Sequence, residues 1–131
     1  MILVDTSIWI EILDGKLGGS VEPGDLARFA TCGPVIQEVV QGIRQARAAA
    51  QVAKSLLAMR RLSDPLPADV FLLAADIYRT GRQRGLAIRS PVDCLIAAIA
   101  IENDVAVWRR DRGFDAIARF TPLRAVRRLP R

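Results

Sequence analysis

The sequence predicts an α/β fold in which a central, mostly parallel sheet carries helices on both faces. Short apolar runs typical of buried strands occur near residues 1–5, 29–32 and 105–108, and segments with helical spacing of apolar residues separate them. Strands that alternate with helices form parallel sheets, because each helix returns the chain to the edge where the previous strand began. With 131 residues, 51% of them hydrophobic, we expect a single domain over residues 1–131 with a substantial core.

The first elements follow from local patterns. The unbroken apolar run Met1-Ile-Leu-Val-Asp5 is typical of a strand buried on both faces, and the hydroxyls of Thr6 and Ser7 are candidate caps for the helix after it. Gly33-Pro34 favours a helix start, because proline suits the first helical position. In chain order we predict a strand over 1–5, a helix over 6–13, a loop over 15–24, a short helix from 25, a strand over 29–32, a helix over 33–43 and a helical pattern over 52–62.

The second half continues the alternation. Ser90-Pro-Val-Asp93 has the spacing of a capping box and opens a stretch that is almost continuously apolar to Ile101, which indicates a buried helix. Three arginines close the helix before it, where cations suit the helix dipole. In chain order we predict a helix over 69–84, a helix over 90–101, a strand over 105–108, a loop over 109–113, a short helix over 114–119 and an edge strand over 123–126.

The composition excludes several kinds of catalysis. The chain has no histidine, and therefore no Ser-His-Asp or Cys-His pair and no histidine-ligated zinc site. Cys32 and Cys94 cannot form a disulfide framework, so we expect two buried free thiols. The longest apolar stretch, Cys94–Ile101, is shorter than the roughly 18 residues that span a bilayer. We therefore expect a cytoplasmic protein without a membrane partner, and any catalysis has to use carboxylates.

Positive charge is concentrated in the last part of the chain. Residues 109–131 hold eight arginines against Asp111 and Asp115, a net charge of +6, whereas the whole chain carries +5. Lys16 and Lys54 are the only lysines among 19 cations, so 17 are arginine. The planar guanidinium suits phosphate oxygens, which favours a polyanionic partner. A solvated arginine-rich surface is the ordinary alternative.

Four carboxylates are predicted to meet at one edge of the sheet. In parallel α/β sheets the functional crevice lies beyond the carboxyl ends of the strands. Asp5 ends the first strand, and Asp111 lies three residues past a later one. Glu38 and Asp93 lie in the first turns of their helices. Each also has an ordinary explanation: Asp5 or Asp93 could cap a helix, Glu38 could be solvated, and Asp111 could be ion-paired.

A divalent metal ion would explain these acids together. Crowded carboxylates repel one another unless a cation neutralises them, and the buried helix of Asp93 carries no other charge as far as Ile101. Oxygen ligands without imidazole or thiolate favour Mg²⁺ or Mn²⁺. Such an ion would hold a phosphodiester and activate water, with Glu38 orienting or deprotonating that water. We expect rim arginines to contact the flanking phosphates, namely Arg89, Arg109, Arg110 and Arg112.

Four segments carry a resemblance to a known family. They are Asp5-Thr-Ser-Ile-Trp, Val35-Ile-Gln-Glu38-Val-Val-Gln-Gly42, Ser90-Pro-Val-Asp93-Cys-Leu-Ile-Ala-Ala98 and Asp111-Arg-Gly-Phe114-Asp-Ala-Ile-Ala118. In this order and spacing, across essentially the whole chain, they resemble the four acidic motifs of PIN-domain ribonucleases, specifically the VapC toxins of bacterial type II toxin–antitoxin pairs.

The resemblance implies a PIN-like three-layer domain and an endoribonuclease that depends on Mg²⁺ or Mn²⁺. It implies a catalytic set of Asp5, Glu38, Asp93 and Asp111, with Asp5 and Asp93 as direct metal ligands. Thr6 or Ser7 matches the hydroxyl that follows the first acid of the family and would orient the metal shell. The resemblance further implies an RNA substrate, a homodimer, and inhibition by a small cognate antitoxin that docks a helical segment at the acidic site.

The fourth motif departs from the family pattern. Members often carry Thr or Ser two residues before its acid and a second acid two residues after it, whereas this chain has Arg109 and Gly113 there. Asp115 is the alternative fourth acid, and a one-metal site remains open. The sequence also fits two other functions less well: a noncatalytic RNA- or partner-binding domain that retains the fold, and a phosphoacceptor domain, for which Lys16 and Lys54 are poorly placed.

Overall fold

The first strand of the chain forms the centre of the sheet. The computed structural model describes residues 1–131, and its five strands are all parallel, in the order β3-β2-β1-β4-β5. On β1, Leu3 pairs with Ala30 on one side and with Val107 on the other. The strands are β1 (Ile2–Val4), β2 (Phe29–Thr31), β3 (Arg60–Arg61), β4 (Ala106–Trp108) and β5 (Ala125–Val126).

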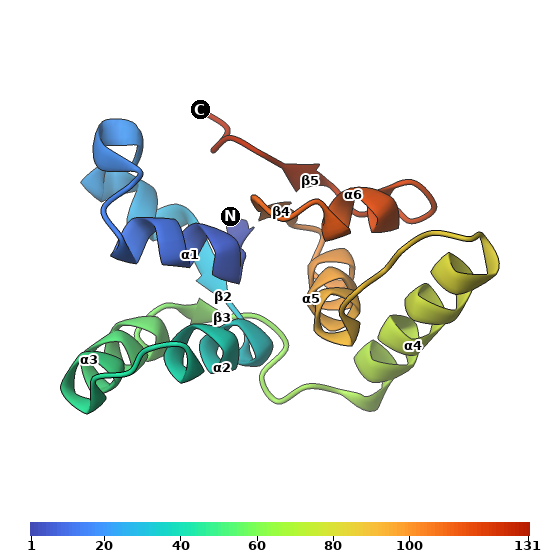
Figure 1. Ribbon diagram of the computed structural model, residues 1–131, viewed down its shortest axis with the longest axis horizontal. Coiled ribbons are helices and arrows are strands. Elements are labelled where there is room, and N and C mark those ends of the chain that lie inside the picture. The colour runs from blue at the N-terminus through green and yellow to red at the C-terminus, as the bar shows by residue number, and fades with distance from the viewer.

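The helices fall into two groups. The helices α1, α2 and α3 pack on one another in series, and α5 packs on both α4 and α6 (Figure 1). Because parallel strands are joined by right-handed crossovers, the two groups cover opposite faces of the sheet, which confirms the predicted α/β class. The helices are α1 (Thr6–Leu13), α2 (Gly33–Gln41), α3 (Ala46–Leu57), α4 (Ala68–Gln83), α5 (Pro91–Glu102) and α6 (Gly113–Ala118), with the short 3₁₀ helices η1 (Gly18–Ser20) and η2 (Pro23–Arg28).

β1 and α5 are apolar because both are buried in the core. All of Ile2–Val4 is buried, and α5 is fully enclosed from Ile96 to Ala100. Three aromatic rings gather beside the sheet: the Phe29 ring lies 6.0 Å from that of Trp9 and 5.8 Å from that of Trp108, centroid to centroid. Burial of these side chains contributes the largest share of folding free energy, about 25 cal/mol per Å² of apolar surface.

Two local predictions were wrong in detail. The helical pattern expected over 52–62 corresponds to α3, which spans Ala46–Leu57 and stops before the short strand β3. Sequence patterns did not indicate β3, because its two arginines are exposed on an edge strand and show no apolar alternation. The predicted loop over 15–24 also contains η1 and the start of η2.

The two cysteines are buried and protonated. Cys32 and Cys94 are both free and buried, as the sequence indicated. Burial raises the pKa of Cys32 to about 12 and that of Cys94 to about 11, so both thiols stay protonated and unreactive near neutral pH. Among the helices, none combines the length and apolar character needed to cross a bilayer.

Candidate functional site

The carboxyl edge of the sheet brings the four predicted acids to one region. Asp5 follows β1 directly and caps α1, with 4% of its surface exposed. Glu38 lies on α2 after β2, and Asp93 lies in the first turn of α5; both are partly buried. Asp111 is exposed on the loop that follows β4. Four separate elements therefore supply one carboxylate each.

Hydroxyl groups of α1 hold two of these acids. The backbone N–H and the Oγ of Ser7 donate to Oδ2 of Asp5 at 3.1 and 2.6 Å. Ser7 Oγ also accepts from the backbone N–H of Arg110, at 3.0 Å, and so ties the loop after β4 to the end of β1. Thr6 Oγ1 donates to Oε1 of Glu38 at 2.9 Å. Thr6 and Ser7 thus position carboxylates on two different elements.

The charges of the four acids influence one another. Burial raises the pKa of Asp93 to about 7, and the negative charges of Asp5, Asp111 and Glu38 add to the effect. Burial also raises the pKa of Asp5, against the lowering effect of the Ser7 hydrogen bonds, and the charge of Asp111 raises it further. Ionised carboxylates are unfavourable in such surroundings unless a cation compensates them.

No arginine compensates these carboxylates. The ion pairs of the chain involve other acids, and none joins an arginine or lysine to Asp5, Glu38, Asp93 or Asp111. A set of oxygen donors without histidine or reactive thiol suits a hard divalent cation. The donor chemistry therefore fits Mg²⁺ or Mn²⁺. As the side chains stand, no three of these ligands are close enough to enclose an ion together.

Gly113 allows the loop after β4 to approach α5. A Cβ atom at this position would lie 2.8 Å from Oδ2 of Asp93 and 3.8 Å from Oδ1 of Asp111. The backbone N–H of Gly113 donates to Oδ1 of Asp111 at 3.1 Å. A side chain at position 113 would therefore crowd the Asp93 carboxylate unless that carboxylate or the loop moved.

Arg109 and Asp115 form a pair of their own. The sequence predicted Arg109 on the rim, but it is buried, with 5% of its surface exposed, and its guanidinium donates to Asp115. The cause is that Arg109 continues the pairing of β4 with β5 through its N–H bond to the carbonyl of Val126, which fixes the backbone and leaves the side chain inside. Arg109 therefore does not face a phosphate, and Asp115 is committed to Arg109.

An open cleft of about 440 Å³ contains the outer part of the site. Asp93, Asp111 and Gly113 line it together with three of the arginines predicted from sequence, Arg89, Arg110 and Arg112. Arg89 and Arg112 are exposed and have no ion-pair partner. The cleft thus combines the partly buried Asp93 and the exposed Asp111 with surrounding cations, an arrangement suited to a phosphate group between them.

Arg110 is held more firmly than the sequence indicated. Its Nε donates to both carboxylate oxygens of Glu11, at 2.9 and 3.1 Å, and its Nη1 donates to the carbonyl of Arg127. The sequence did not predict a role for Glu11, because a single acid on a solvated helix face belongs to no recognisable motif. Only the three-dimensional arrangement of α1 beside the loop after β4 reveals its role.

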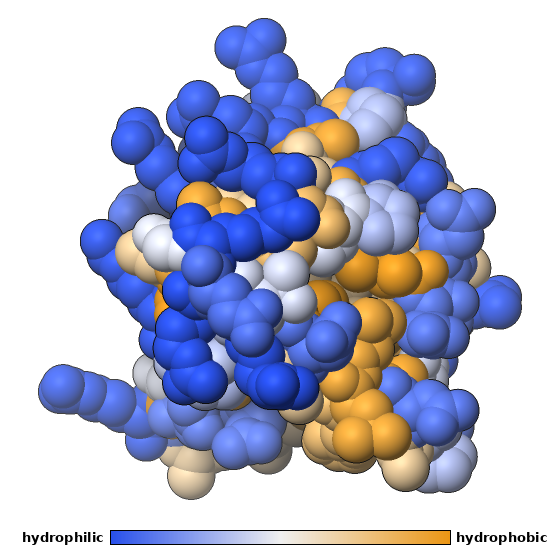
Figure 2. Space-filling view, turned by 90° about the vertical axis from the view of Figure 1, so that its right-hand side faces the viewer, coloured by the Kyte–Doolittle hydropathy of each residue, from blue (hydrophilic) through white to orange (hydrophobic).

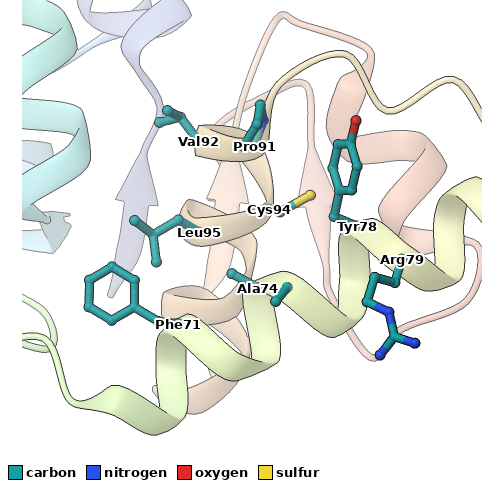
Figure 3. A pocket seen from close by; sticks show the side chains of 9 residues that line it. Phe71, Ala74, Tyr78, Arg79, Pro91, Val92, Cys94 and Leu95 are labelled. Carbon is teal, nitrogen blue, oxygen red and sulfur yellow. The ribbon is translucent and has the colours of Figure 1, made fainter.

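A second concave surface has a different character. It lies between α4 and α5, measures about 430 Å³, and is lined mainly by apolar side chains such as Phe71, Tyr78 and Leu95 (Figure 3). Phe71 and Leu72 are 50% and 69% exposed, and apolar residues form a strip within a hydrophilic surface on the side that carries α4 (Figure 2). Its only thiol, Cys94, has a raised pKa of about 11 and is therefore protonated near neutral pH.

The fold and the acidic edge together define a class of protein. Residues 2–120 match the PIN domain, with the four acids in their expected order inside the matched region. The chain therefore belongs to the PIN-domain family.

Within that family it is similar to the VapC ribonuclease Mb1587 of Mycobacterium bovis and to ribonuclease VapC11 of Mycobacterium tuberculosis. It is 36% identical to each over an alignment of 140 positions that covers 96% of this chain and 98% of the relative. Among solved structures, VapBC-5 of Mycobacterium tuberculosis, a member of the VapBC family of toxin–antitoxin systems, superposes with a TM-score of 0.70. The match covers 96% of this chain and 97% of that one at 22% identity, and supports the fold.

Proposed function

We propose that this protein is an endoribonuclease that hydrolyses RNA phosphodiester bonds with the help of Mg²⁺ or Mn²⁺, and that it is the toxin of a type II toxin–antitoxin pair. The observation that carries the proposal is the meeting of Asp5, Glu38, Asp93 and Asp111 at one sheet edge without an arginine partner, in a chain with 17 arginines. The similarity to two VapC ribonucleases supports the choice of RNA as substrate.

The residues of the site have distinct roles in this proposal. Asp5 and Asp93 would hold a divalent cation, which when bound supplies Lewis-acid activation of water and neutralises phosphate charge. Ser7 fixes the Asp5 carboxylate, and Thr6 orients Glu38 through the 2.9 Å hydrogen bond to Oε1. Glu38 is the candidate base that accepts a proton from the attacking water.

Phosphate binding completes the site. Arg89 and Arg112 extend from the cleft that holds Asp93 and Asp111, and their guanidinium groups would contact the phosphates on either side of the scissile bond. In the hydrolysis, the water oxygen forms a bond to phosphorus, the bond from phosphorus to the leaving ribose oxygen breaks, and that oxygen takes up a proton. Asp111, the exposed fourth acid, completes the negative environment of the site.

The partners follow from the same similarity. The solved VapBC-5 structure is a toxin–antitoxin system, and we propose a small antitoxin as the partner that inhibits this chain. We also propose a homodimer in the cytoplasm, which light scattering of the purified chain would test. A noncatalytic RNA-binding domain is the alternative function. It is favoured by the departure of the fourth motif, with Arg109 and Gly113 in place of a hydroxyl residue and an acid.

The decisive experiment measures RNA cleavage. The purified chain is incubated with a mixed-sequence single-stranded RNA in Mn²⁺, in Mg²⁺ and in EDTA, with Asp5→Asn as the control. We expect cleavage in either metal, and no cleavage in EDTA or with the control variant. Cleavage that survives in EDTA contradicts the metal-dependent mechanism, and RNA binding without cleavage in any metal supports the noncatalytic alternative.

A further inference from the structure

A further cleft, distinct from the apolar groove between α4 and α5, adjoins the acidic site and is lined mainly by arginines; we call it the second cleft. It measures about 680 Å³ and is lined by Arg110, Val126, Arg127 and Arg128, with no acidic residue among them. Arg127 and Arg128 are exposed and have no ion-pair partner. A concave surface with uncompensated cations and no acid attracts anions, and arginine forks suit phosphate oxygens.

Arg110 joins this cleft to the acidic one. Its side chain lines both clefts, the one with Asp93 and the one with Arg127. Its backbone N–H donates to Ser7 Oγ, which in turn binds Asp5. A polyanion that occupies the acidic cleft therefore needs only to pass Arg110 to reach the second cleft.

The backbone of the second cleft is fixed. The carbonyl of Arg127 accepts hydrogen bonds from Nε1 of Trp108, at 3.2 Å, and from the guanidinium of Arg110. Trp108 is itself buried in the core beside Phe29. The arginine side chains thus extend from an anchored segment that follows β5, which lowers the entropic cost of ordering them around a ligand.

We propose that Arg127 and Arg128 bind the phosphates of an RNA strand where it continues beyond the acidic site, past Arg110, whose own charge is paired with Glu11. The inference rests on the proposed ribonuclease function and extends it. No aromatic side chain lines either cleft, so the contacts are to the backbone and are insensitive to base identity. An acidic segment of a protein is the competing ligand, but the direct connection to the acidic cleft through Arg110 favours the strand that is cleaved.

The test uses the salt dependence of RNA binding. Affinity for a fluorescein-labelled single-stranded RNA of mixed sequence is measured by anisotropy at several salt concentrations, in an Asp93→Asn background that prevents cleavage. The variant Arg127→Gln/Arg128→Gln is compared with Arg44→Gln/Arg47→Gln, two exposed arginines near the start of α3 that line neither cleft. Both pairs lower the net charge by the same amount.

We expect the cleft variant to bind more weakly and to lower the slope of log affinity against log salt by about 1.4, since each phosphate contact to a single strand contributes about 0.7. The control pair should leave the slope unchanged. Arg127→Lys/Arg128→Lys should restore most of the slope, because charge rather than shape is responsible. Circular dichroism melts check that each variant is folded.

Three outcomes overturn the inference. Equal slopes for the cleft and control variants exclude phosphate contacts at Arg127 and Arg128, even if the native chain cleaves RNA normally. Unchanged RNA binding with loss of binding to a labelled polyglutamate peptide assigns the cleft to an acidic protein segment instead. Absence of RNA binding by the native chain removes both this inference and the proposed function. A reduced slope for the cleft variant, together with a native chain that never cleaves RNA, supports the phosphate-binding cleft and contradicts the nuclease.

Discussion

Asp5 at the sheet edge and Asp25 in η2 are buried to almost the same extent, with 4% and 5% of their surfaces exposed, but their surroundings differ completely. Asp25 accepts hydrogen bonds from the backbone N–H of Glu22 at 2.8 Å and from Arg131 at 2.9 Å, and it forms an ion pair with Arg28. These contacts, led by the Glu22 N–H, hold its pKa below the ordinary value.

The sheet edge shows the opposite arrangement. Asp5 accepts hydrogen bonds from uncharged donors, chiefly Ser7, and burial together with the nearby Asp111 charge raises its pKa. The fold can therefore surround a buried carboxylate with arginine, and does so at Asp25, but forms no ion pair to the four acids at the sheet edge. Buried charges without partners cost stability, and such costs concentrate at functional sites. The contrast separates a carboxylate that is paired within the fold from the carboxylates that we propose bind a ligand.

The test with the largest expected effect removes one negative charge at the acidic edge, from Asp93, and one in η2, from Asp25. We expect Asp93→Asn to lower RNA cleavage at least about 100-fold, the scale for loss of one electrostatic group in an active site. Its melting temperature should stay the same or rise, because an amide has no charge to bury. Asp25→Asn should do the reverse, with a melting temperature lower by several degrees and normal cleavage by the folded protein. Cleavage gels and thermal melts measure both, and an active Asp93→Asn variant would contradict the site.

Metal binding should distinguish the two locations as well. At a Mn²⁺ concentration about 100 times the dissociation constant, the native chain should gain about 2.7 kcal/mol in unfolding free energy. Asp25→Asn should show the same gain, and Asp5→Asn should lose it. Denaturant unfolding with and without Mn²⁺ provides the measurement. An equal gain in all three proteins would place metal binding elsewhere.

A smaller effect should follow from filling the space beside Asp93. Gly113→Ala places a Cβ atom 2.8 Å from Oδ2 of Asp93, so the carboxylate or the loop has to move. We expect cleavage to fall between about 10- and 100-fold, since displacement by about 1 Å is costly in catalysis. Gly19→Ala is the matched control, because a Cβ atom there meets nothing within 4 Å. Equal activity of the two variants would show that the position of Asp93 is not critical.

The pH dependence of stability should reveal the Asp25 cluster. Because folding lowers the pKa of Asp25 below 3.8, its contribution is fully present above that value and is lost as pH falls through the folded pKa. We expect the difference in unfolding free energy between the native chain and Asp25→Asn to be constant above about pH 5 and to shrink in more acidic solution. Urea unfolding across this range tests it, and a difference that grows on acidification would contradict the assignment.

The sequence predicted the fold class because the strong patterns lie in the interior. The run Ile2–Val4 and the apolar helix α5 form the centre of the sheet and its cover, and both were recognised from local composition. β3 was missed because Arg60 and Arg61 gain their strand conformation from pairing with β2, which no local signal encodes.

The four acids of the candidate site were predictable from the sequence, but the contacts around them were not. Asp5, Glu38, Asp93 and Asp111 were identified from their positions after strands and in first helical turns, and the structure brings them to one edge. The prediction that Arg109 lies on the rim was wrong, because the direction of its side chain depends on the pairing of β4 with β5. The link from Ser7 to Arg110 joins residues 103 positions apart, a distance at which sequence patterns carry no information.

The position of β1 has a consequence for the growing chain. β1 is made first, yet one of its two neighbours, β4, begins only at Ala106. On the ribosome, one flank of β1 therefore stays unpaired until β4 has been synthesised. Asp5 waits equally long for Asp111, so a nascent chain that stops short of Asp111 has no complete acidic edge.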